Sequence, residues 1–424
     1  MTSSATRKFF SAAALATALA AFAAPATLDA RPRNGLGEFI GLQKYLLDPY
    51  ETNGPSVDAY FATVPEYLFA NTSTLPFGSM ATVPALTSGA EISGILRHLG
   101  QPHFLPDNTT APDREIDTYY GPLTNSRDGL HPALRGEWET YAFGNWNFGE
   151  YDNGRNRPDY NYETWGGLAG AQRWLDDERM IGFAGSYNFT RAKIPGGGGH
   201  IDGDGFRAHL YAALVPEGQP WWLAFGASGG WLNYKTKRFQ TTPAFGEAMN
   251  YPQAGAHATP QAYEVGVFAA LNARLHLTDD LVFTPFARVN YDSVSVSRFT
   301  EHNADAAWRL RVSRFHSDSL QTRLGGGLEY TLRLDSAILA ASCSAAWASE
   351  LAGDDVKVAA AFDDYPSIRY KTKGPQLFGD AVEIAPALSL TFRNGIVLHA
   401  AYTLHITFDA QFAQGFSGGL SWRF

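Results

Sequence analysis

From residue 136 to the C-terminus, apolar side chains recur at every second position, and this rhythm limits the fold more than any other feature of the chain. Side chains alternate across a β-strand, so each such stretch has one apolar face and one small or polar face. Between 395 and 408, for example, Ile396 and Leu398 lie on one face and His399 on the other. The rhythm predicts twelve strands: 136–148, 163–175, 180–194, 204–216, 221–238, 261–277, 281–299, 319–334, 337–351, 381–392, 395–408 and 411–424.

The last stretch, 411–424, shows which solvent these strands face. Phe416, Leu420 and Trp422 lie on one face, whereas the opposite face consists mainly of Gly and Ser. An edge strand of a water-soluble sheet is the alternative, but its polar face would rarely be so rich in these two residues. The strand fits the wall of a membrane barrel, which is apolar outside and polar inside.

The chain has no second route through a bilayer. After the N-terminal apolar run, no window contains eighteen consecutive apolar residues, so no later segment could cross as a helix. Lipid offers no hydrogen-bond partners to an open sheet edge, so the strands must close into a ring. The sequence therefore predicts an all-β fold, a twelve-stranded antiparallel up-and-down transmembrane barrel, with a lumen wide enough for about one helix or an extended chain.

Charged residues on the polar faces of these strands should point into the lumen, where we expect them to be solvated or to grip a threaded segment. They are Glu139, Arg207, Glu264, Arg274, Arg288, Asp292, Arg323, Glu329, Arg333, Glu383 and Arg423.

The connections between the strands alternate between long and short. Short turns such as 176–179 and 217–220 follow long loops such as 149–162, 300–318 and 352–380. Outer-membrane barrels show this asymmetry, with short turns in the periplasm and long loops outside the cell, and an even strand number places both barrel ends in the periplasm.

Eight tryptophans fall near predicted strand ends, where the aromatic girdles of a membrane barrel meet the lipid interfaces. They are Trp138, Trp146, Trp174, Trp221, Trp222, Trp231, Trp347 and Trp422.

Residues 1–26 have the layout of a secretory signal peptide, in which Arg7 and Lys8 precede an Ala-rich apolar run and a small-residue cleavage site. Residues 27–134 contain no tryptophan and many prolines, so we expect a short, partly helical or flexible segment before a barrel at 135–424. Within it, 36–47 and Ser88–Leu99 are helix candidates. Ser88 and Glu91 have the spacing of a capping box, followed by an apolar stripe through Leu99.

Composition and spacing offer little support for chemistry. The net charge of −9 argues against a nucleic-acid partner, and one cysteine, Cys343, excludes an internal disulfide. We expect no catalytic residues, no metal site and no cofactor. Gly415–Gly419 matches the nucleophile elbow of hydrolases but lies on a strand without a following helix. His316–Ser319 contains the residue types of a catalytic triad, but consecutive residues cannot place the base against the nucleophile. Asp202–Gly205 could help to bind calcium in a surface loop, but its Gly and Asp residues are more typical of a simple turn.

Several short stretches, in order, resemble the β-domain of autotransporters, the translocating barrel of type V secretion. They are Ile181–Tyr187, Leu210–Ala212, Pro285–Ala287, Phe299–Glu301, Ser319–Gly325 and Ala345–Glu350. The resemblance covers about residues 135–424. Family members usually carry a basic residue or His where this chain has Ser349, before the Glu of the Trp-x-x-Glu motif.

The resemblance implies a barrel that passes its own N-terminal segment through the lumen and then holds part of it there. Ser88–Leu99 or an extended stretch within 105–135 would be the plug. Ser417, Gly419, Trp422 and Phe424 resemble the signal read by the barrel assembly machinery. Some members cut themselves between adjacent asparagines; this chain has no such pair, so we expect its short segment to stay attached.

Two other functions are compatible with a barrel in the outer membrane. A passive pore would conduct small solutes whether or not residues 27–130 were present. A barrel hydrolase would need catalytic side chains clustered at one rim, and the sequence offers no such set.

Overall fold

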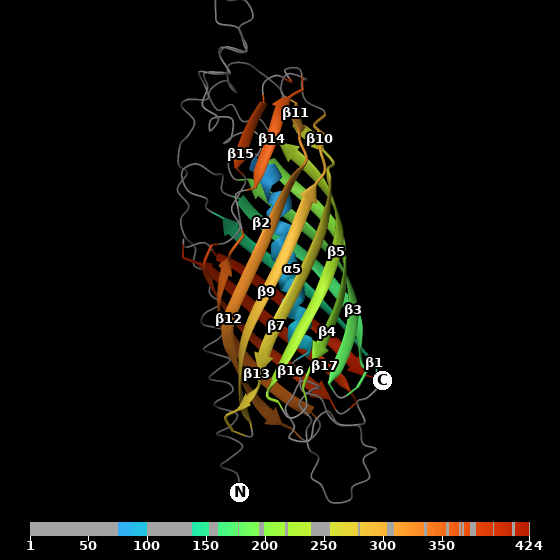
Figure 1. The fold of residues 1–424 in the computed structure, drawn as a ribbon, viewed down its shortest axis with the longest axis vertical. Helices are drawn as coiled ribbons and strands as arrows, with labels where there is room; N and C mark the ends of the chain where they lie inside the picture. The colour runs from blue at the N-terminus through green and yellow to red at the C-terminus, as the bar shows by residue number, and fades with distance from the viewer. Residues whose placement is uncertain are drawn as a thin grey trace, which may run out of the picture. The chain divides into compact units, whose positions relative to one another are not determined.

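A computed structural model describes residues 75–99 and 138–423, with gaps in the second range at 152–159, 177, 195–198, 217–218, 239–254, 279, 303–308, 335–336, 353–355, 364–365, 367–368, 374–378, 393 and 409–411. Three predictions fall outside the described residues: the signal peptide at 1–26, the helix at 36–47 and the extended plug within 105–135. One helix and a ring of strands make up most of the described chain (Figure 1).

Twelve long strands form the ring. They are β1 (Trp138–Tyr151), β2 (Tyr160–Trp174), β3 (Arg179–Ile194), β4 (Gly199–Leu214), β5 (Trp221–Arg238), β7 (Gln261–Ala273), β9 (Leu281–Val296), β12 (Phe315–Arg333), β13 (Ala337–Glu350), β16 (Ala381–Phe392), β17 (Ile396–Thr407) and β18 (Phe412–Arg423). Short strands β6 (Ala256–Ala258) and β8 (Leu275–His276) extend it at β5 and β9.

The first and last strands close the ring. β1 pairs with β2 on one side and with β18 on the other, in a register that places Trp146 opposite Phe416. Because every ring strand is antiparallel to both neighbours, the backbone groups of the wall are paired within the wall itself. The prediction of a twelve-stranded antiparallel barrel is confirmed.

The alternation of the sequence becomes an inside and an outside. On β12, Leu324 on the outer face is 67% exposed, whereas Gln321 on the inner face is 7% exposed. The same holds on β18, where Trp422 is exposed and Ser421 is buried. Large apolar side chains thus cover the outside, as lipid contact requires.

Two of the predicted girdle residues are exceptions. Trp174 and Trp222 are only 4% and 5% exposed and lie inside the barrel, so placing them at the lipid interface was wrong. Both lie one residue out of phase with an exposed neighbour, Leu175 and Trp221. The other six, Trp138, Trp146, Trp221, Trp231, Trp347 and Trp422, are exposed, as is Trp165, which the sequence analysis did not select.

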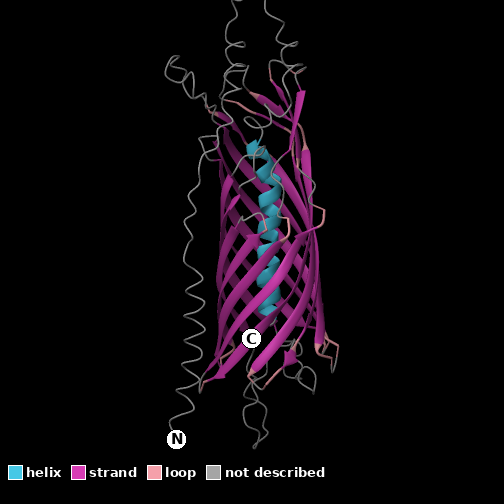
Figure 2. Ribbon diagram, turned by 90° about the vertical axis from the view of Figure 1, so that its left-hand side faces the viewer, coloured by secondary structure: helices cyan, strands magenta, loops and turns pink. Residues whose placement is uncertain are grey.

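Helix α5 (Leu75–Leu99) runs inside the ring and contacts strands on all its sides, among them β1, β3, β5, β9 and β12 (Figure 2). It begins well before Ser88, so the capping-box prediction was wrong: Ser88 and Glu91 lie in mid-helix and face the barrel wall. No helix in the described ranges has the length and apolarity needed to cross a membrane.

Loops at the end of the barrel opposite the short turns build a second sheet. Its strands are β10 (Phe299–Thr300), β11 (Leu310–Val312), β14 (Lys357–Phe362) and β15 (Arg369–Lys373), in the order β10-β11-β14-β15. We call it the loop sheet. A buried ion pair holds its base, because Arg238 of β5 donates to both carboxylate oxygens of Glu301, at 2.9 and 2.6 Å.

Candidate functional site

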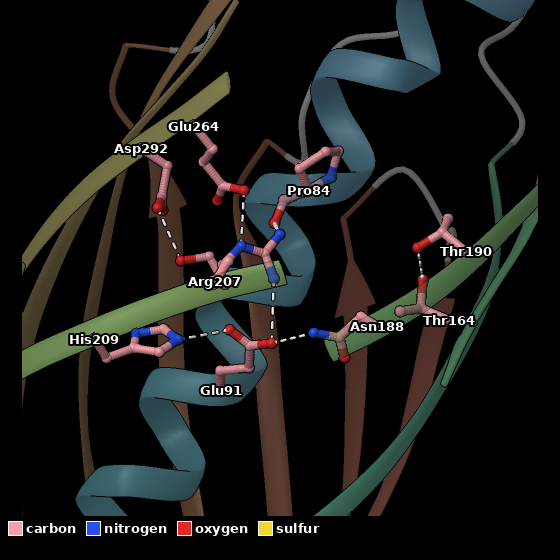
Figure 3. A network of polar contacts seen from close by, with 10 residues as sticks. Pro84, Glu91, Thr164, Asn188, Thr190, Arg207, His209, Glu264 and Asp292 are labelled. Atoms are coloured by element: carbon pink, nitrogen blue, oxygen red, sulfur yellow. Dashed lines mark hydrogen bonds and ion pairs between the residues drawn. The ribbon is translucent and has the colours of Figure 1, made fainter. Parts of the chain in front are cut away.

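The contact between α5 and the barrel wall centres on Glu91, the one acidic residue of the helix. Its side chain is 1% exposed. Asn188 of β3 donates to one carboxylate oxygen, and the same oxygen lies 3.2 Å from Nη1 of Arg207. His209 contacts the other oxygen through Nε2 at 3.0 Å (Figure 3). A buried carboxylate is stable only with such partners, so Glu91 fixes the helix at this height in the lumen.

Arg207 of β4 joins helix and wall through all of its guanidinium nitrogens. Besides Nη1 on Glu91, its Nε donates to Glu264 of β7 at 2.7 Å and its Nη2 to the carbonyl oxygen of Pro84 at 3.1 Å. The planar guanidinium presents five N–H donors in a fixed fork, which suits three acceptors on two elements. Arg207 therefore binds both the one carboxylate of the helix and a backbone carbonyl of the helix.

Pro84 explains a second contact with the helix backbone. Proline has no N–H, so within a helix it leaves the carbonyl four residues earlier without its usual donor. That carbonyl belongs to Met80, and Tyr234 of β5 donates its hydroxyl to it at 2.7 Å. The wall thus supplies the donor that the helix sequence omits.

Ser88 extends the polar contact to strand β9, the neighbour of β7. Its hydroxyl donates to Asp292 of β9 at 2.9 Å, and both side chains are buried. Figure 3 shows Asp292 and Glu264 on neighbouring strands on the far side of Arg207. Together with Glu91, Asn188, Arg207, His209 and Glu264, these residues form a network that we call the latch.

A small cavity of about 20 Å³ lies beside the latch, lined by Pro84, Arg207 and Tyr234 among others. That volume is about the space one water molecule needs. This cavity therefore leaves room for about one water molecule beside the latch.

Below the latch, the helix packs against an apolar lumen. Ile92, Ile95, Leu96 and Leu99 are buried in one cluster with wall residues that include Tyr141, Phe143, Leu168, Trp174, Met180, Tyr211, Trp222 and Phe268. Burying each aliphatic side chain contributes about 1.5–3 kcal/mol. The expectation of a wet interior does not hold here, because large side chains and the helix exclude water at this end.

Phe143 shows how closely the helix approaches the wall. Its ring packs so tightly on Gly94 of the helix that a Cβ there would overlap the ring, and a Cβ at Gly419 of β18 would overlap the Cβ of Phe143 and the carbonyl oxygen of Ala142. Gly419 faces inward beside the β1–β18 closure, and only a residue without a side chain leaves room for the backbone of β1 and the Cβ of Phe143. The two glycines thus fit the helix to the seam of the barrel.

A second polar group follows further along the helix. Arg97 donates to the hydroxyl of Ser417 on β18 at 3.0 Å. Nearby on the wall, Nε of Arg323 donates to Glu383 at 3.1 Å, and Glu383 lies 3.9 Å from His405. The helix therefore contacts both polar and apolar parts of the lumen, on strands from both halves of the chain.

The structure places most of the predicted lumen charges inside and in contact with one another. Glu139 accepts from Gln172, Arg274 pairs with Glu329 at 2.7 Å, and the guanidinium of Arg288 lies 4.3 Å from the ring centroid of Phe286. Arg333 is exposed at the end of β12, and the side chain of Arg423 lies outside the described part. Arg207, Glu264, Asp292, Arg323 and Glu383 contact the partners given above.

Other sequence candidates do not come together as sites. On β12, Ser317 and Ser319 face inward while His316 faces outward, so the strand separates these residues. Asp202 lies on β4 and not in a loop, and it pairs with Arg191 at 2.6 Å. The described residues contain no group of three or more His, Cys, Asp or Glu side chains that could hold a metal ion.

Four residues of these contacts were not selected from the sequence: Asn188 and His209 of the latch, and Tyr234 and Pro84 beside it. Two signals could have found their partners. Glu91 is the one carboxylate in a 25-residue helix, and Pro84 interrupts its middle. A lone buried charge and a missing N–H each require a partner from elsewhere in the fold.

The solved structures to which the chain is similar include three from autotransporters. Among solved structures, the chain is similar to the translocator domain of autotransporter NalP from Neisseria meningitidis, with a TM-score of 0.52 and 13% identity over 68% of this chain and 88% of that one. The β-domain of the Bordetella autotransporter BrkA has a TM-score of 0.49 and 17% identity, over 67% of this chain and 98% of that one. The transport unit of AIDA-I from Escherichia coli has a TM-score of 0.48 and 11% identity, over 71% and 95%.

No curated relative matches the sequence. The family model described as autotransporter beta-domain matches residues 140–403, more than half of the chain and nearly all of the ring. Together with the closed twelve-stranded barrel, this match shows the family of the chain. The chain belongs to the autotransporter beta-domain family and is an outer-membrane translocator barrel.

Proposed function

We propose that this barrel carries its own N-terminal segment to the cell surface and then retains α5 in the lumen as a plug. The observation that carries the proposal is the burial of Glu91 among Asn188, Arg207 and His209, three wall residues on two strands. A carboxylate so placed has matched partners at one height in the lumen, so the latch defines the position at which movement of the segment ends.

The energetics favour a retained helix. Removing one member of a buried ion pair costs about 3–5 kcal/mol, because the remaining charge stays buried without compensation. Sliding α5 by one turn, roughly 5.4 Å, would break the Glu91, Ser88 and Met80 contacts together. The apolar cluster around Leu99 adds a second set of contacts that hold the helix in this position.

The orientation follows from the loops and from the helix. We place the long loops and the N-terminal end of α5 at the cell surface, with the short turns and both barrel termini in the periplasm. The last strand, with Ser417, Gly419, Trp422 and Phe424, would be read by the barrel assembly machinery before the ring closes. In this proposal the chain acts by transport and retention, with no catalytic step and no cofactor.

Protease treatment of intact cells tests export. An epitope tag near Thr27 should be removed from the surface by added protease, while a tag in the 217–218 turn should be protected until the outer membrane is broken. Protection of both tags in intact cells would contradict export of the N-terminal segment.

Conductance in planar bilayers tests retention and separates the plug from a passive pore. The wild-type barrel should be nearly closed, and Glu91→Ala should raise the open fraction. A passive pore would give a steady conductance that does not change when the latch is altered. The control is Glu178→Gln, because Glu178 is an exposed residue of the β2–β3 turn.

A further inference from the structure

The loop sheet has one buried face and one strongly basic face. Register places Arg311 of β11 opposite Ala361 of β14, and Ala361 opposite Arg369 of β15, so these three side chains share a face. Lys357 and Lys371 belong to the same face, because side chains repeat every two residues along a strand. The opposite face carries Leu310, Val312, Val358 and Ala360, which are all buried.

Cations dominate the outer face. Lys357, Arg311, Arg369 and Lys371 are exposed, and Arg309 is half-buried beside them. Among the described residues of this face, one carboxylate, Asp363, offsets this positive charge. It pairs with Arg309 at 2.9 Å and with Arg311. A basic face on a chain whose net charge is −9 marks a surface for an anionic partner.

The sheet also ends in an open strand. In the order β10-β11-β14-β15, strand β15 has one neighbour, β14, within the described part of the chain. An edge strand offers unpaired backbone N–H and C=O groups to an extended segment. Ala359 and Ala361 lie between the cations, so no large side chain obstructs the approach across the face.

An acidic stretch of the same chain starts beside the loop sheet. Helix α5 contacts both β14 and β15, and Figure 1 shows its first turns close to them. Residues 49–74 lead directly into Leu75, and they carry Glu51, Asp58 and Glu66 with no Lys, Arg or His. Glu66 is nine residues before Leu75, so the chain can carry it at most about 30 Å from the start of the helix.

We propose that the basic face of the loop sheet binds residues 49–74 of its own chain, with Glu51, Asp58 and Glu66 on Lys357, Arg369 and Lys371. The docking rests on the part of the proposed function that holds α5 in the lumen, because that position delivers the acidic stretch to the sheet. It adds a surface on which the segment leaving the barrel is held beside the pore.

The tether makes weak contacts sufficient. Exposed ion pairs contribute about 0–1 kcal/mol each, too little to bind a separate peptide. A short covalent connection raises the effective concentration of the segment to roughly millimolar, so a few such pairs can hold it. Phosphate groups of membrane lipid are the competing anions, but they lack this connection to the sheet.

Carbodiimide cross-linking of the purified full-length chain tests the proposal, since this reagent joins a carboxylate to a lysine amine in contact with it. Mass spectrometry should find Glu51, Asp58 or Glu66 linked to Lys357 and Lys371 in preference to Lys193, Lys235 and Lys237, which lie at the same end of the barrel. In about 0.5 M NaCl, where the Debye length is roughly 4 Å, the yield should fall about fivefold.

Matched triple variants provide the control. A second readout is acylation of the lysines by an added amine-reactive reagent, from which a docked segment protects them. In Glu51→Gln/Asp58→Asn/Glu66→Gln, acylation of Lys357 and Lys371 should rise about fivefold, which corresponds to about 1 kcal/mol of lost protection. Asp107→Asn/Asp113→Asn/Asp117→Asn removes the same charge from the stretch after α5 and should leave both lysines protected. Equal acylation in wild type and both variants would overturn the proposal.

Two further outcomes would also overturn it. Cross-links spread evenly over all the lysines at this end would show proximity without docking. Protection of Lys357 and Lys371 only when lipid A vesicles are added, to the same extent in both triple variants, would identify lipid phosphate as the occupant. All of these readouts use purified protein, so failure of docking is separate from failure of export on intact cells.

Discussion

The hydroxyl of Tyr234 donates a hydrogen bond of 2.7 Å to the carbonyl oxygen of Met80, the acceptor that Pro84 leaves without a helical donor. The donor comes from strand β5 and the acceptor from the helix in the lumen, so a defect in one element is completed by the other. An isolated helix with Pro84 in its middle would be weakened by about 3 kcal/mol. Inside the barrel, part of that cost is offset by a contact that fixes the height of the helix.

Tyr234→Phe should loosen the helix without disturbing the wall. Loss of the hydroxyl leaves the buried Met80 carbonyl unsatisfied, at a cost of about 1–3 kcal/mol. We expect a higher frequency of brief openings in planar bilayers and an unchanged barrel on heat-modifiability gels. Tyr263→Phe is the matched control, because Tyr263 faces outward from β7. Equal opening in both variants would show that the Met80 contact does not hold the helix.

Glu91→Ala should have a larger effect than Tyr234→Phe. It leaves His209 without its carboxylate partner and Arg207 with Glu264 and the Pro84 carbonyl, so the helix loses about 3 kcal/mol of docking free energy. Glu91→Gln keeps the shape of the side chain and some of its hydrogen bonds. Its effect on the open fraction should therefore lie between the effects of Tyr234→Phe and Glu91→Ala. The open fraction of each variant in planar bilayers tests this ranking. If glutamine and alanine gave the same open fraction as wild type, the latch would not control the pore.

Two glycines of the helix allow a test of packing alone. Alanine at Gly94 would overlap the ring of Phe143, whereas the nearest wall atom to a Cβ at Gly89 is Nη2 of Arg323, at 3.4 Å. Gly94→Ala should therefore destabilise the docked helix by about 1–3 kcal/mol, while Gly89→Ala should be neutral or favourable through helix propensity. Hydrogen exchange of α5 amides in the folded barrel measures the difference. Restored protection in Gly94→Ala/Phe143→Leu would assign the effect to the ring.

The barrel was predictable from sequence because lipid outside and a polar or packed lumen inside impose one alternation on every strand. Strand ends were less certain: β4 begins at Gly199, inside the stretch predicted as a loop. Gly199 has a positive φ of 120° and starts a strand whose Asp202 pairs with Arg191. Loop-like composition was overridden there by pairing with β3, which local sequence does not reveal.

The site was only half predictable, and the helix shows why. Ser88 and Glu91 have the spacing of a cap, but the same two side chains face Asp292 and Arg207 across the lumen. Local spacing cannot separate these roles, because the partners lie more than a hundred residues away in the chain. Trp174 and Trp222 failed for a related reason. An aromatic residue at a strand end suits either the lipid interface or the closed end of the lumen, and only the phase of the strand decides.

The closure of the ring offers a last test, at two adjacent glycines of β18. A Cβ at Gly419 would overlap the carbonyl oxygen of Ala142 and the side chain of Phe143, both on β1, whereas at Gly418 it would lie 3.5 Å from the nearest atom, the carbonyl oxygen of His399. Gly419→Ala should therefore strain the β1–β18 pairing and lower the free energy of unfolding by about 1–3 kcal/mol, whereas Gly418→Ala should change it little.

Urea unfolding in lipid vesicles measures this difference on folded protein, and the heat-modifiable fraction recovered from cells measures assembly. If Gly419→Ala unfolds like wild type in vesicles but accumulates unfolded in cells, the glycine acts in recognition by the assembly machinery and not in packing. If both measurements match those of Gly418→Ala, neither role belongs to Gly419. A loss of stability in vesicles would assign the glycine to the seam, where β1 pairs with β18 and Phe143 of β1 packs on Gly94 of the helix.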